Sequence, residues 1–191
     1  MFKKTLFAVV TASLFSGAAF NASADDQGHG TVNFTGTVIT APCSVAPESS
    51  NIDVWLGQVA DSVLNGSSDA TAADFSIHLI DCTLVKDDGT GNPVTTSKVD
   101  VTFSATNVDA TDTSLINNTK ENNYGGAKNV GVRILDANYN KITLGQPLAV
   151  NFTDVNSPTQ NLDFHARMES PTHTASEGDV AAQATYVLTY Q

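Results

Sequence analysis

The chain of 191 residues has few of the residues that define several common classes of protein. It contains two cysteines and one tryptophan, and its 9 basic residues are outnumbered by 20 acidic ones, which gives a formal net charge of −11. An acidic surface of this kind argues against nucleic acid or an anionic membrane as a partner. Two distant cysteines without a second pair also make a thiolate metal site a poor interpretation.

Long apolar runs are missing as well, apart from one at the N-terminus. Residues 5–20 are mostly apolar, follow the basic pair Lys3 and Lys4, and precede the small-residue sequence Ala22-Ser23-Ala24. A membrane-spanning helix needs about 20 apolar residues, and this run is shorter and is interrupted by polar side chains. We predict a secretory signal peptide over residues 1–24 and no transmembrane span, with an uncleaved anchor as the alternative.

The predicted export of the chain determines how the two cysteines are interpreted. Cys43 and Cys82 both follow the predicted signal peptide, and a cysteine pair in an oxidising compartment forms one disulfide by default. Closing a loop of about 40 residues would stabilise the fold by roughly 4 kcal/mol in the chain-entropy model.

Helical periodicity is nearly absent after the signal peptide, whereas alternation of apolar and polar residues recurs. This period of two is typical of strands with one buried face. Turn-rich spacers separate the runs, and the long ones at 61–73, 86–97 and 106–127 are expected to be loops. The pattern predicts an all-β sandwich. The clearest alternating runs are residues 30–38, 52–56, 74–84, 99–103, 130–134, 162–168 and 180–190.

The first and last of these runs share an unusual property. Residues 30–38 follow a short polar leader, so no earlier strand can form a hairpin with them. Residues 180–190 run to the end of the sequence, and an open apolar final strand exposes a free monomer to aggregation. Either the two runs pair within one chain, or the first completes a sheet in another molecule, as in donor-strand complementation.

Several short motifs, in order along nearly the whole chain, resemble the chaperone–usher fimbrial subunits of Gram-negative bacteria. The resemblance is strongest to the major subunits of type 1-like fimbriae. The motifs are residues 30–38, Ala41-Pro42-Cys43, Leu56-Gly57-Gln58-Val59, residues 77–82 with the spacing Ile-x-Leu-x-x-Cys, residues 129–135, and the ending at 184–191.

The resemblance implies an incomplete immunoglobulin-like β-sandwich, the pilin fold, over residues 39–191, with a donor-strand extension over residues 25–38. A periplasmic chaperone would first fill the open groove, and at the outer-membrane usher the extension of the next subunit would replace it. The subunit would pass through the periplasm to a surface fimbrium and support adhesion. The implied inward face of the donor strand is Gly30, Val32, Phe34, Gly36 and Val38.

At the other end of the chain, the resemblance implies an edge that pairs with the chaperone. Tyr190 matches the penultimate aromatic residue of the family, and Gly178 matches its glycine at the fourteenth position from the end, with Gln191 counted as the first. The terminal carboxylate of Gln191 would meet basic residues of the chaperone. The residues implied for this edge are Gly178, Ala184, Tyr186, Leu188, Tyr190 and Gln191.

An enzyme or a metalloprotein has little support from the residues. Ser67-Ser68-Asp69 lacks the strand–turn–helix context of a nucleophile elbow, and no two histidines have close ligand spacing. Residues 136–140 imitate the start of a calcium loop, but Lys141 stands where glycine is required. We therefore expect a non-catalytic protein without a metal or a cofactor.

Two other functions remain open from the sequence. A minor or adaptor pilin would share the same fold. A stand-alone secreted binding module would instead hold residues 30–38 in its own sheet and fold as a stable monomer without a chaperone.

Overall fold

The computed structural model describes residues 30–66, 69–87, 89 and 91–191, so the predicted signal peptide and residues 25–29 lie outside the described residues. The chain divides into two units, Met1–Val38 and Ile39–Gln191, and each is described by itself. Every strand of the described residues belongs to the second unit.

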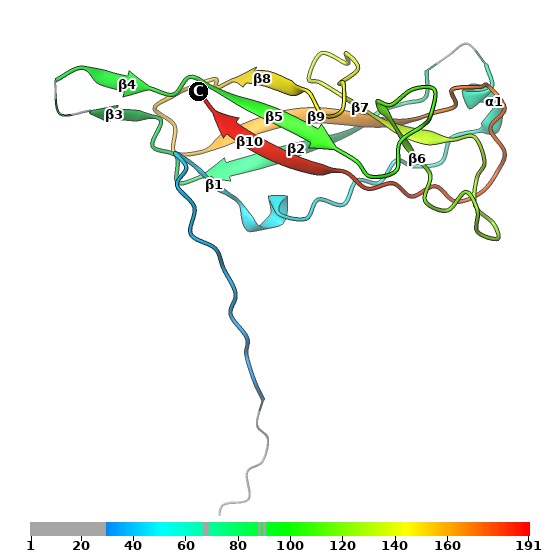
Figure 1. The fold of residues 1–191 in the computed structure, drawn as a ribbon, viewed down its shortest axis with the longest axis horizontal. Helices are drawn as coiled ribbons and strands as arrows, with labels where there is room; N and C mark the ends of the chain where they lie inside the picture. The colour runs from blue at the N-terminus through cyan, green and yellow to red at the C-terminus, as the bar shows by residue number, and fades with distance from the viewer. Residues whose placement is uncertain (1–29, 67–68, 88, 90) are drawn as a thin grey trace, which may run out of the picture. The chain divides into compact units, whose positions relative to one another are not determined.

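The second unit is built almost entirely from β-strands (Figure 1), as the alternating sequence pattern predicts. Its only helical elements among the described residues are the short turns η1 (Pro47–Ser49) and α1 (Asp61–Leu64). The strands are β1 (Ser44–Val45), β2 (Ala73–Ile80), β3 (Val85–Asp87), β4 (Pro93–Thr95), β5 (Lys98–Ser104), β6 (Leu115–Asn117), β7 (Gly131–Leu135), β8 (Pro147–Asn151), β9 (Gln160–Glu169) and β10 (Thr185–Tyr190).

These strands form two main sheets in which every pair is antiparallel. The larger sheet has the order β1-β2-β9-β7-β6, and the smaller has the order β10-β5-β8. β3 and β4 form a separate two-stranded ribbon. β10, the last strand of the chain, therefore lies at an edge of the smaller sheet.

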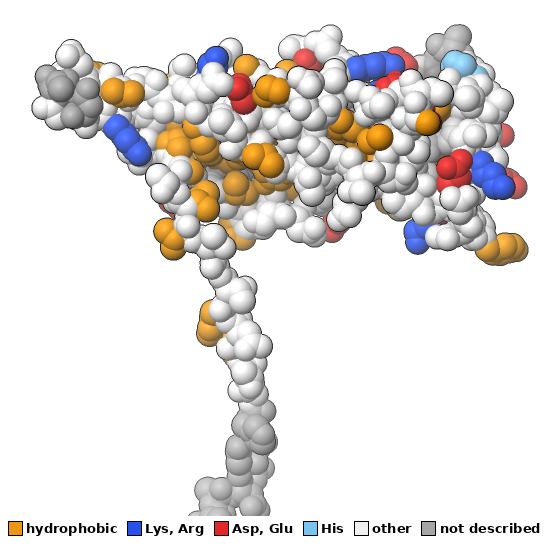
Figure 2. Space-filling model, viewed as in Figure 1, with side chains coloured by type: hydrophobic (Ala, Val, Ile, Leu, Met, Phe, Trp, Pro, Cys, Tyr) orange, Lys and Arg blue, Asp and Glu red, His pale blue; other side chains and the backbone are white. Residues whose placement is uncertain are grey.

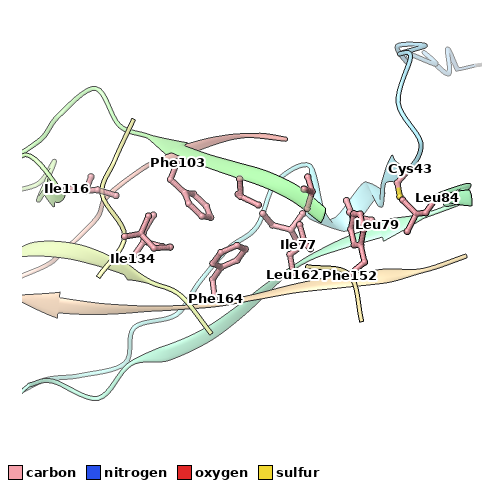
Figure 3. Close-up of a cluster of buried hydrophobic side chains, with 13 residues drawn as sticks. Cys43, Ile77, Leu79, Leu84, Phe103, Ile116, Ile134, Phe152, Leu162 and Phe164 are labelled. Atoms are coloured by element: carbon pink, nitrogen blue, oxygen red, sulfur yellow. The ribbon is translucent and has the colours of Figure 1, made fainter. Parts of the chain in front are cut away.

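The core lies between the inward faces of the two sheets. Alternate residues of β2, β5 and β9 point inward and are buried, among them Ile77, Val101 and Leu162. Phe103 of β5 meets Phe164 of β9 edge to face with ring centroids 5.0 Å apart, a favoured aromatic geometry. Figure 3 shows these two rings pointing toward each other from opposite sides of the core.

The predicted disulfide is confirmed. Cys43, which directly precedes β1, is bonded to Cys82, which follows β2. Because β1 and β2 are neighbours in the sheet, the bond ties the start of the sandwich to its second strand, and the described residues hold no free cysteine.

Two kinds of expectation about local structure are wrong. The segments 61–73, 86–97 and 106–127 are not plain loops, since they contain α1, the β3–β4 ribbon and β6. The expected strands at 52–56 and 180–184 are in no ladder. A strand assignment requires hydrogen-bonded neighbours, and both segments face a gap in the sandwich.

An ion-pair network lies on the larger sheet, on the side away from this gap. Arg133 of β7 is 2% exposed, and its guanidinium donates to Asp112 and, over 3.1 Å from Nε, to Glu169 Oε2. Arg167 of β9 donates to the other oxygen of Glu169 from Nη2 over 2.7 Å. Lys141 adds a more exposed contact of 3.3 Å to Glu169. The carboxylate of Glu169 therefore lies between the guanidinium groups of Arg133 and Arg167, which are register partners across β7 and β9.

Candidate functional site: an open groove and an unpaired N-terminal segment

A groove with a volume of about 1280 Å³ opens along the side of the second unit. One wall is residues 50–61, and the other is residues 176–186, which lead into β10. The floor is apolar and includes Phe75, Phe103, Ile134 and Met168, which belong to four different strands. The groove therefore gives solvent access to the hydrophobic interior of the sandwich.

Each side of the groove presents backbone groups that are open to a further strand. Among the described residues, no backbone hydrogen bond involves residues 51–59. β10 pairs on one side only, with β5, from Thr185 opposite Ser104 to Tyr190 opposite Val99. Unpaired backbone groups at a sheet edge are a template for a further strand, so the gap has the character of a missing strand position.

The groove continues past β10 as a second cavity of about 500 Å³. It lies between residues 39–45 and residues 186–190. Figure 2 shows hydrophobic side chains at the surface beside β10 in this region. Tyr186 lines both cavities, and its hydroxyl donates to the carbonyl of Ser49 in η1 over 2.7 Å. Burial raises the pKa of both Tyr186 and Tyr190.

The structure brings together the C-terminal residues that the sequence singled out. Ala184, Tyr186, Leu188 and Tyr190 are partly buried and pack on the main core. Gly178 lies farther along the same wall at φ +144°, where a Cβ would come within 2.4 Å of the Ala127 backbone nitrogen. Glycine is thus required by both the backbone angle and the available space.

The first unit, in its described residues 30–38, forms no strand. Val32 is 72% exposed, Phe34 is 90% exposed and Val38 is fully exposed. A Cβ added at Gly36 would meet no atom within 4 Å. These apolar side chains alternate with threonine and asparagine, and they belong to neither of the core clusters formed by the described residues.

The wall at residues 52–59 was missed as part of the site. Ile52, Val54 and Leu56 alternate in the sequence and are partly buried, but the strand predicted from this alternation is in no ladder. The alternation of apolar and polar residues indicates which face of a segment is buried, but it does not indicate whether the backbone has a hydrogen-bonded neighbour. Only the position of this segment opposite β10 identifies it as the second wall.

The residues that the sequence raised as possible metal ligands contact neighbouring protein groups. His78 contacts Asn161 and His165 contacts Asp74, each with its cross-strand neighbour on β2 or β9. The Asp136 carboxylate accepts backbone N–H groups within its own turn. The described residues hold no cluster of three or more potential metal ligands. Among the same residues, none of the helices is long and apolar enough to span a membrane.

Comparison with known proteins identifies the family of the chain. The model of the family described as "Fimbrial protein" matches residues 32–191. The chain belongs to the fimbrial protein family. A fimbrial protein of this family is a structural subunit of a surface fimbrium, and its fold is the immunoglobulin-like sandwich of chaperone–usher pilins.

Individual relatives agree with the family assignment. The fimbrial protein is 45% identical to the fimbrial-like protein YgiL of Escherichia coli K12, over 100% of this chain and 98% of that one. It is 37% identical to the major MR/P fimbria protein of Proteus mirabilis, over 99% of each chain. A solved structure of a chaperone–usher pilus is similar with a TM-score of 0.66 and 26% identity, over 86% of this chain and 97% of that one.

Proposed function

We propose that this subunit polymerises head to tail by donor-strand exchange, with residues 30–38 of one copy filling the groove of the next. The observation that carries the proposal is that one chain holds both an alternating segment that forms no strand and a groove with one wall whose backbone has no partner and another wall that leads into the open edge of β10. A donor at one end and an acceptor along the body make a heterologous contact that does not close, and such contacts generate filaments.

The energetics favour insertion of the exposed apolar face. Burial of a Val or Phe side chain contributes about 1.5–3 kcal/mol before ordering costs, and Val32, Phe34 and Val38 are all exposed in the free segment. The inserted backbone would also form hydrogen bonds with β10 and with residues 52–59, which have free groups. In this proposal Gly30 and Gly36 complete the inward face.

An open apolar groove is an aggregation hazard in a subunit that has not yet assembled. We therefore propose that a periplasmic chaperone covers the groove after residues 1–24 are removed, and that an outer-membrane usher exchanges it for the next subunit. The chaperone would pair with β10, where Ala184, Tyr186 and Leu188 lead to Tyr190 and Gln191. The filament would then extend from the cell surface and support adhesion.

The substitution Gly36→Leu tests the proposed register. Gly36 has open space around it in the free subunit, so a leucine there should leave folding and chaperone binding unchanged. In the filled groove a residue without a Cβ allows close approach of the backbone, and we expect leucine to lower fibre yield by at least about tenfold, on the order of the strain caused by overpacking a filled site. Fibre yield is measured by electron microscopy and by heat-sensitive oligomers on gels.

The matched control is Thr35→Leu, one position away on the opposite face of the donor segment. It adds a similar side chain that would point out of the groove, so fibre yield should stay near that of the wild type. Equal yields from Gly36→Leu and Thr35→Leu would contradict the proposed register.

A further inference from the structure

Trp55 is exposed on the rim of the groove. It belongs to the wall without backbone partners, where Ile52, Val54 and Leu56 are partly buried and the residues between them point outward. Its side chain is 82% exposed. A single exposed hydrophobic residue needs no special explanation, but this one lies directly beside a vacant strand position.

We propose that Trp55 packs over the outer face of the donor strand once a second copy of this chain has filled the groove. The proposal rests on the donor-strand function above and adds a contact on the side opposite the buried face. Filling the gap places the donor next to residues 52–59, so side chains that point outward from the two segments become cross-strand neighbours.

The donor segment carries suitable partners for an indole ring. Its outward residues are Thr31, Asn33, Thr35 and Thr37, three of which offer a β-branched methyl group. Directly opposite residues in a sheet have Cβ atoms about 5 Å apart and diagonal ones about 7–8 Å apart, so a tryptophan reaches more than one of them. Aromatic and β-branched residues form favourable cross-strand pairs.

The opposite wall carries a related feature. Val187 of β10 is an exposed hydrophobic residue, flanked by Thr185 and Thr189 on the outward face of that strand. A donor between the walls would therefore have Trp55 on one side of its threonines and Val187 on the other. Together they would form a thin apolar layer over the inserted backbone and shield its hydrogen bonds from water.

The test uses the fact that Trp55 is the only tryptophan in the chain. The variant that lacks residues 30–38, whose groove no other copy can fill, is mixed with a synthetic peptide of residues 30–38, which contains no tryptophan, and binding is measured from the anisotropy of a labelled copy of that peptide. With the unlabelled peptide, the emission of Trp55 should shift to shorter wavelength, and quenching by acrylamide should fall. Peptide binding with unchanged emission and quenching would overturn this inference alone. Absence of peptide binding would overturn the donor-strand proposal, and this inference with it.

A thermodynamic cycle separates direct packing from a merely structural role. Trp55→Ala should weaken binding of the peptide about two- to fivefold, the range expected for one cross-strand pair. A peptide with serine in place of Thr31, Thr35 and Thr37 should bind the wild type and Trp55→Ala with equal affinity, because the methyl groups are gone. The control Tyr124→Ala removes another exposed aromatic ring, outside the groove lining, and should bind like the wild type. Equal weakening of both peptides by Trp55→Ala would contradict the proposed contact.

Discussion

Deletion of residues 30–38 is expected to abolish fibre formation while leaving the body of the subunit folded. All strands and both core clusters of the described residues lie within Ile39–Gln191, so the deletion removes no core side chain. The deleted segment would, however, supply the only donor face in our account. The measurement is the ladder of oligomers seen on gels without heating, together with electron microscopy of exported material.

The control for this deletion keeps the segment and changes only its outward face. Serine in place of Thr31, Asn33, Thr35 and Thr37 keeps all five inward residues, so the ladder should persist. Circular dichroism and thermal unfolding of the chaperone-bound deletion variant check that the sandwich is intact. Fibres from the deletion variant, or an unfolded body even with a chaperone present, would show that residues 30–38 are not an intermolecular donor.

Glu169→Gln is expected to cause the largest loss of stability among single substitutions in the ion-pair network. The side chain of Glu169 is 14% exposed, and it contacts Arg133 at 3.1 Å and Arg167 at 2.7 Å. Removing its charge leaves two guanidinium groups facing each other across β7 and β9, with Asp112 still paired to Arg133 and Asp69 to Arg167. Breaking a buried pair so that the partner charge is left unpaired costs about 3–5 kcal/mol. Because each arginine keeps one carboxylate, we expect a smaller loss of about 2 kcal/mol in the free energy of unfolding, measured by urea denaturation.

Lys141→Ala is the matched control, because it removes another charge that contacts Glu169. The Lys141 side chain is 58% exposed, and surface pairs contribute about 0–1 kcal/mol. Its stability should therefore remain close to that of the wild type. Similar losses from Lys141→Ala and Glu169→Gln would contradict the central position that we assign to Glu169.

Because of this ion-pair network, we expect the free energy of unfolding to fall in acid. Burial alone raises the pKa of Glu169, but the hydrogen bonds and charges of Arg167 and Arg133 outweigh it and hold that pKa below its ordinary value. The hydrogen bond from Arg133 lowers the pKa of Asp112. A carboxyl group whose pKa is lowered in the folded state stabilises the fold at pH values above its ordinary pKa of about 4. This contribution is lost as the pH falls through the folded-state pKa, and in Glu169→Gln the decline in acid should be shallower.

The sequence was sufficient to predict the class of fold and the disulfide. Alternation in β5 and β9 is strict because each strand has one face on the core, and the cysteines pair because β1 and β2 are neighbours. The β3–β4 ribbon was taken for a loop because the turn signals around Gly89 and Gly91 do not reveal that the flanking residues pair with each other.

Contacts between residues that are far apart in the sequence could not be predicted from it. Arg133 and Glu169 are 36 residues apart and meet only because Gly131 is the register partner of Glu169. The hydrogen bond from Tyr186 to Ser49 crosses 137 positions. Neither pair has a local sequence signal, since both depend on how the strands align in three dimensions.

Amide hydrogen exchange on assembled fibres and on isolated subunits tests the central claim most directly. We predict that the amides of residues 31–38 and of residues 52–59 are protected in fibres, and that both segments exchange freely in the isolated subunit. Free exchange of residues 31–38 in intact fibres would contradict the account. Equal protection of that segment in a well-folded monomer would also contradict it, because the missing strand would then come from the same chain.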